Sequence, residues 1–62
     1  MDENERKILH FLTGPSRFRF RSLEAISKGT GISADAALAT LENSAYFRRE
    51  ASRGILWTVA TN

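Results

Sequence analysis

The sequence contains no cysteine, a single proline and a single histidine among its 62 residues. Without cysteine, disulfide bonds and thiolate metal sites are excluded, and nothing favours an oxidising compartment. No apolar run approaches the roughly 20 residues of a membrane-spanning helix, and the acidic first residues lead into no signal-peptide core. We therefore expect a cytoplasmic protein in which His10 is a partly exposed helix residue and no metal ion is bound.

The motifs of catalysis are missing as well. There is no glycine-rich phosphate loop followed by Lys and Ser or Thr, and no pair of metal-ligand motifs. Nothing in the sequence places His10 and a carboxylate beside a serine. A chain this short also has little volume for a walled pocket. The sequence therefore predicts a protein that is not an enzyme and that binds no cofactor.

The composition that remains is that of one small globular domain. Hydrophobic residues make up 42% of the sequence, which is ordinary for a folded domain. A chain of this length buries only about 60% of the surface that its unfolded state exposes. We expect a single domain over residues 1–62, with a small core and marginal stability.

The central stretch, residues 22–47, predicts two helices joined by a glycine turn. Residues 22–28 form the first helix, residues 29–32 form the turn, and Ser33 is a favourable N-cap for a longer second helix. The positions expected to face the core recur at helical spacing. They are Ala34, Ala37, Leu38, Leu41 and Ala45.

The segment before residue 22 predicts a helix and then a strand. Residues 2–13 carry an apolar stripe at helical spacing and begin with a capping-box pattern, Asp2 with Glu5. Gly14 before a proline should end the helix in a left-handed cap. Arginine and phenylalanine then alternate over residues 17–21. A strand there would place Phe18 and Phe20 in the core and all three arginines on the opposite face.

The segment after residue 46 predicts a β-hairpin. Residues 46–50 leave the second central helix as a strand, and residues 51–54 are a polar turn. Residues 55–60 are rich in β-formers and read as the return strand, so the hairpin covers residues 47–60. Ile55, Trp57 and Val59 alternate along it and are expected to share the core face.

The predicted order is helix, strand, helix, helix, strand, strand, which resembles the winged helix-turn-helix family over nearly the whole chain. The resemblance is carried by the helix-turn-helix at 22–46, the hairpin at 47–60, and the ending Leu56-Trp57-Thr58-Val59-Ala60. It implies a small α+β fold with three helices and a three-stranded antiparallel sheet, in which the first strand pairs with the third. It also implies that the third helix enters the DNA major groove. The hairpin, called the wing below, would touch the DNA backbone or minor groove.

Positive charge is concentrated outside the helix-turn-helix. Residues 22–47 hold one lysine against three carboxylates, a balance of −2, and arginines cluster on either side. Together the two clusters would form a phosphate-binding surface. Alternatively, the first cluster is a solvated strand face that blunts a sheet edge, and Arg53-Gly54 is a simple turn. The candidate phosphate contacts are Arg17, Arg19, Arg21, Arg48, Arg49 and Arg53, and the candidate base contacts are Thr40 and Asn43.

Two functions follow as hypotheses. The first is a double-stranded DNA-binding module of a regulatory protein, held mainly by arginine–phosphate contacts. The second is a protein-interaction domain without nucleic acid, because the family that the chain resembles also includes such domains. It is motivated by the third helix, which has Asp35 and Glu42 and no arginine or lysine. A partner or a second copy would dock on its alanine-rich face, made of Ala36, Ala39, Thr40 and Asn43.

Overall fold

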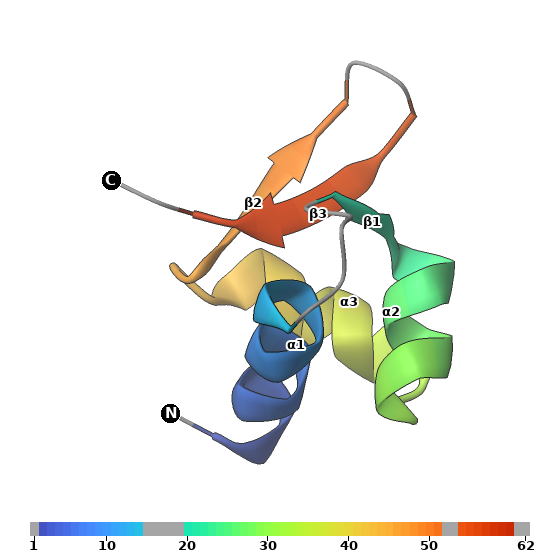
Figure 1. Cartoon of the computed structure of the whole chain (residues 1–62), viewed down its shortest axis with the longest axis vertical. Helices are drawn as coiled ribbons and strands as arrows, with labels where there is room; N and C mark the ends of the chain where they lie inside the picture. Colours follow the sequence, from blue (N-terminus) through green and yellow to red (C-terminus); the bar gives the residue numbers. More distant parts are fainter. Residues whose placement is uncertain (1, 15–19, 52–53, 61–62) are drawn as a thin grey trace.

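A three-stranded antiparallel sheet covers one side of three helices (Figure 1). The computed structural model describes residues 2–14, 20–51 and 54–60. In chain order the elements are α1 (Glu3–Thr13), β1 (Arg21–Ser22), α2 (Leu23–Thr30), α3 (Ala34–Asn43), β2 (Phe47–Glu50) and β3 (Leu56–Val59). This is the predicted order, and it gives a small α+β fold with the arrangement of a winged helix.

Strand β3 lies in the middle of the sheet. The strand order is β1-β3-β2, with Trp57 of β3 opposite Arg21 on one side and Arg49 on the other. The predicted pairing of the first strand with the third is therefore confirmed, as is the hairpin of β2 and β3. Because cross-strand partners share a face of the sheet, Arg21, Trp57 and Arg49 form one row across it.

The start of α1 is fixed by the predicted capping box. The Asp2 carboxylate accepts a hydrogen bond from the Glu5 backbone N–H at 2.8 Å, and the Glu5 carboxylate accepts one from the Asp2 N–H at 3.1 Å. The second oxygen of Glu5 accepts a hydrogen bond from the Ser44 hydroxyl at 2.7 Å. Glu5 therefore caps its own helix and also holds the segment that follows α3.

The end of α1 differs from its prediction. Gly14 has φ −67° and ψ −173°, which is extended backbone, so the predicted left-handed cap is wrong. The residue before a proline is restricted to extended conformations, and Gly14 precedes Pro15 in the sequence. Proline therefore decides the geometry of this helix end, and the freedom of glycine is not used.

The turn between α2 and α3 is shorter than predicted. Helix α2 continues through Gly29 to Thr30, and only Gly31 takes the left-handed conformation, with φ 77°. The Gly31 N–H donates to the Ser27 carbonyl oxygen at 3.0 Å and closes the helix. Gly29 serves packing instead, because a Cβ atom there would lie 2.1 Å from Cε1 of Phe11.

The apolar face of α3 is confirmed only in its centre. Ser33 caps the helix as predicted, and Ala37 and Leu41 are buried. Ala34 and Ala45, both expected in the core, are exposed. Ala34 occupies the first turn and Ala45 lies beyond Asn43, the last helical residue, so neither lies over the core. Leu38 is half-buried against it.

The core lies between the helices and the inner face of the sheet. Ile8 of α1, Ile26 of α2 and Leu41 of α3 are the largest fully buried side chains. Each such side chain contributes about 1.5–3 kcal/mol when it is removed from water. The remaining buried apolar residues are Leu12, Ile32, Ala37, Phe47 and Trp57.

The first strand reverses the predicted facing. Phe20, expected in the core, is 41% exposed, and Arg21, expected outside, is half-buried. Arg21 lies opposite Trp57, whose ring packs toward the helices, so the alternation turns Phe20 outward. The Arg21 guanidinium carbon lies 4.8 Å from the centre of the Phe11 ring. Phe18 lies outside the described residues.

None of the helices within residues 2–14, 20–51 and 54–60 is long and apolar enough to cross a membrane.

Candidate nucleic-acid interface

The two wing arginines of β2 point to opposite faces of the sheet, because successive side chains of a strand alternate. Both are exposed. Arg48 lies on the outer face, where its Nη1 atom is 3.3 Å from Oε2 of Glu50. An exposed pair of this kind is worth about 0–1 kcal/mol, so it restrains Arg48 without removing it from solvent.

Arg49 lies on the same face of the sheet as Arg21. Both are cross-strand neighbours of Trp57, and neighbouring strands are about 4.8 Å apart, which places the two arginine backbones about 10 Å apart. The structure therefore brings one member of each arginine cluster to one face. Arg21 itself stacks on Phe11 and is half-buried, whereas Arg49 is exposed. Arg17, Arg19 and Arg53 lie outside the described residues.

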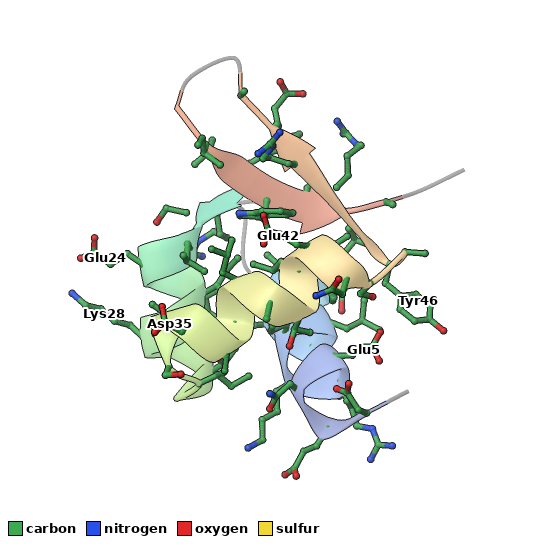
Figure 2. The ribbon with its side chains drawn as sticks, turned by 180° about the vertical axis from the view of Figure 1, so that it is seen from behind. Glu5, Glu24, Lys28, Asp35, Glu42 and Tyr46 are labelled. Atoms are coloured by element: carbon green, nitrogen blue, oxygen red, sulfur yellow. The ribbon has the colours of Figure 1, made fainter. Side chains whose placement is uncertain are left out.

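The exposed face of α3 is negative. Asp35 and Glu42 are both exposed, and Figure 2 labels both of them on α3. Neither Asp35 nor Glu42 forms a salt bridge within the part of the chain that the structure describes. Two unpaired carboxylates would repel a phosphate backbone from this face of α3.

The two candidate base contacts bond to their own helix. The Thr40 hydroxyl donates to the Ala36 carbonyl oxygen at 3.0 Å, and the Asn43 amide donates to the Ala39 carbonyl oxygen at 2.8 Å. Thr40 is also half-buried, although Asn43 is exposed. Each side chain keeps an oxygen that can accept a hydrogen bond. The single donor of Thr40 would have to leave the helix to read an acceptor on a base edge, whereas the Asn43 amide keeps a second N–H for such a contact.

Three features of this surface were not predicted from the sequence: the pairing of Arg48 with Glu50, the stacking of Arg21 and the exposure of Ile55. Glu50 restrains Arg48 from two positions away, and the period of two in a strand would have shown that they share a face. No sequence signal links Arg21 to Phe11. Ile55, expected in the core with Trp57, is 59% exposed because it precedes β3 and no helix covers it.

The described residues contain no cluster of metal-ligating side chains. Among the described residues, no three side chains of His, Cys, Asp or Glu come together in an arrangement that could hold a metal ion. His10 is exposed on α1.

Comparison of the chain with models of protein families, with curated proteins and with solved structures gives no match in any of the three. What the chain does has therefore to be inferred from its own residues and their geometry.

Proposed function

We propose that this domain is a double-stranded DNA-binding module of a regulatory protein that holds the phosphate backbone with its arginines. The observation that carries the proposal is the exposed pair of arginines on β2, the edge strand of the wing. Arg48 points to the outer face of the sheet, and Arg49 points to the inner face, where it stays exposed although Arg21 on the same face is half-buried against Phe11. The wing thus presents charge on both sides of its edge strand, an arrangement that suits a backbone running past it.

The proposal assigns no base reading to α3. Its exposed carboxylates, Asp35 and Glu42, disfavour a position deep in the negatively charged major groove. Phosphate contacts fix position but carry no sequence information directly. The binding is therefore expected to be weak, salt-sensitive and nearly independent of sequence.

The salt dependence of binding to a random-sequence duplex tests the proposal. In a plot of the logarithm of the binding constant against the logarithm of salt concentration, the binding constant falls with salt, and each phosphate contact adds about 0.9 to the steepness of the slope. Arg49→Ala should reduce the slope by about 0.9, and the double substitution of Arg48 and Arg49 should reduce it further. Fluorescence anisotropy at several salt concentrations measures the slope.

Lys28→Ala is the matched control, because Lys28 is also an exposed cation but lies on α2 and pairs with Glu24 at 3.5 Å. It should leave the slope unchanged. An unchanged slope in the double arginine variant would remove the wing from the interface.

A specific observation favours a second function, protein interaction through α3. The Thr40 hydroxyl and one N–H of the Asn43 amide donate within the helix, while Asp35 and Glu42 are exposed and unpaired within the described residues. Such a face suits a partner that supplies positive charge, or the wing of a second copy of this chain. Its small side chains allow close approach.

Ala39→Arg tests this second function without disturbing the core. Ala39 is exposed, whereas Ala36 packs against the core and would be overpacked by arginine. The substitution should abolish self-association measured by sedimentation velocity, and it should leave or strengthen DNA binding. Self-association that survives in Ala39→Arg, or a wild-type chain that stays monomeric, would exclude docking of a second copy on α3.

A further inference from the structure

A surface hollow of about 540 Å³ lies between α1 and the end of α2. Its lining residues belong to α1 and α2 and include neither Arg48 nor Arg49 of the wing, although Arg21 of β1 stacks on one of them, Phe11. Figure 1 shows the last turn of α2 away from the sheet, whereas the end of α1, to which His10 and Phe11 belong, lies below the sheet. The lining residues are Arg6, Lys7, His10, Phe11, Gly29 and Thr30.

The apolar part of the hollow is the ring of Phe11. Its edge lies so close to Gly29 that any side chain at that position would displace it. The guanidinium of Arg21 stacks on the same ring, with its carbon 4.8 Å from the ring centre. The ring is thus held by two neighbours, and the α2 wall beside it carries no side chain at Gly29.

The α1 side of the hollow is cationic. Arg6 and His10 are exposed and lie one helical turn apart on one face. Arg6 forms no salt bridge within the described residues, whereas Lys7 pairs with Glu3 at 3.5 Å. Arg6 is therefore the cation most available to a ligand, and the His10 ring adds an N–H donor beside it.

The α2 side offers hydrogen-bond acceptors. The last carbonyl groups of a helix have no intrahelical donor, and α2 ends at Thr30. The Gly31 N–H satisfies the Ser27 carbonyl, and among the described residues no donor is bonded to the carbonyls of residues 28–30. The hollow thus combines cations, an aromatic ring and carbonyl acceptors within a short distance.

We propose that this hollow binds an acidic peptide segment of a partner protein that carries an apolar side chain. Its carboxylates would meet Arg6 and His10, its apolar side chain would cover Phe11, and its backbone N–H groups would donate to the end of α2. A nucleic-acid backbone offers phosphates but no N–H donors. A small molecule would stay largely exposed here, because small-ligand sites usually enclose most of their ligand.

The probe is a capped hexapeptide of glutamates around a central Leu-Phe pair, titrated into the ¹⁵N-labelled chain and followed by NMR. The expected result is saturable shifts of the amides of residues 6–11 and 29–30. A matched peptide with glutamine in place of every glutamate should bind about fivefold more weakly, since it keeps the apolar and backbone contacts but loses the charge.

Two charge-reversal variants locate the site. Arg6→Glu should weaken binding of the glutamate peptide about fivefold or more, because attraction becomes repulsion. Lys28→Glu makes the same charge change on an exposed α2 residue outside the hollow, and it should have little effect. His10→Ala provides a second variant within the hollow and should also weaken binding.

The inference is independent of DNA binding and fails separately from it. Absence of shifts at millimolar peptide, equal binding of the glutamine peptide, or equal losses in Arg6→Glu and Lys28→Glu would overturn it. Shifts of residues 6–11 and 29–30 produced by a DNA duplex and not by the peptide would overturn it in favour of a nucleic acid. Loss of DNA binding in the wing variants would leave the peptide result unchanged.

Discussion

Gly29→Ala should destabilise the domain, although the same change stabilises most helices. Alanine at an interior helix position is favoured over glycine by about 1 kcal/mol. At Gly29, however, the added Cβ would lie 2.1 Å from Cε1 and 2.6 Å from Cζ of Phe11. Carbon atoms in contact prefer about 3.5–4.0 Å, so the ring of Phe11 would have to move by more than about 1 Å.

The magnitude follows from what the ring loses. Overpacking of this kind costs about 1–3 kcal/mol. The ring would also lose its stacking with Arg21, worth about 0.5–1 kcal/mol at an exposed site. Set against the helix preference, the net loss is about 0.5–3 kcal/mol. In a domain of this size that corresponds to a melting temperature lower by about 2–24 °C.

Thermal unfolding followed by circular dichroism measures this change, and the background of Phe11→Leu provides the control. Leucine lacks Cε1 and Cζ, the two ring atoms nearest the added Cβ, and its shorter branch can turn away from the place of Cδ1, so in that background Gly29→Ala should raise stability by up to about 1 kcal/mol. The reversal of sign is the diagnostic result. A melting temperature that is unchanged or higher for Gly29→Ala alone would refute the close approach of Phe11 to α2.

Two further predictions concern the helices. Asp2→Ala should lower the free energy of unfolding by about 0.5–2 kcal/mol, because it removes the side-chain acceptor for the Glu5 N–H. Urea denaturation measures this loss, and Asp35→Ala, at an exposed α3 position, should lower the free energy of unfolding by less. Leu41→Ala should lower the free energy of unfolding by about 2–5 kcal/mol, because it leaves a cavity under α3, and this loss is enough to unfold a domain this small at 37 °C. The prediction is contradicted if Trp57 fluorescence shows the variant unfolding cooperatively at the same urea concentration as the wild type.

The parts of the fold that the sequence predicts well are those with a local physical signal. Asp2 with Glu5, and Ser33, sit where a helix needs an acceptor for its first N–H groups, and both caps form in the structure. The hairpin is likewise marked by β-formers on either side of a polar turn. These signals act over a few residues, so tertiary packing does not need to be known.

The errors arise where packing decides between local alternatives. The alternation before β1 shows that Phe20 and Arg21 face opposite ways, but only the register with Trp57 decides which of them faces the helices. A phenylalanine is the expected core residue, yet Arg21 takes the inner place by stacking on Phe11. In the sequence, Gly29 similarly looks like a turn residue. In the structure it lies within α2, and glycine is needed there because the Phe11 ring of α1 packs against it.

The candidate site shows the same division. Exposure of Arg48 and Arg49 could be predicted from their charge, and the structure confirms it. The ion pair of Arg48 with Glu50 and the side-chain bonds of Thr40 and Asn43 to α3 depend on particular rotamers. The hollow between α1 and α2 joins residues more than a dozen positions apart, and no pattern within either helix indicates it.

The carboxylate of Glu5 has a consequence for how the domain opens. One of its oxygens belongs to the cap of α1, and the other holds Ser44, whose hydroxyl oxygen also accepts from the Tyr46 N–H at 3.2 Å. Fraying of the first helical turn therefore releases the connection from α3 to β2 in the same event. The chain's first turn and its middle should exchange their amide hydrogens as one cooperative unit, although 39 positions separate Glu5 from Ser44.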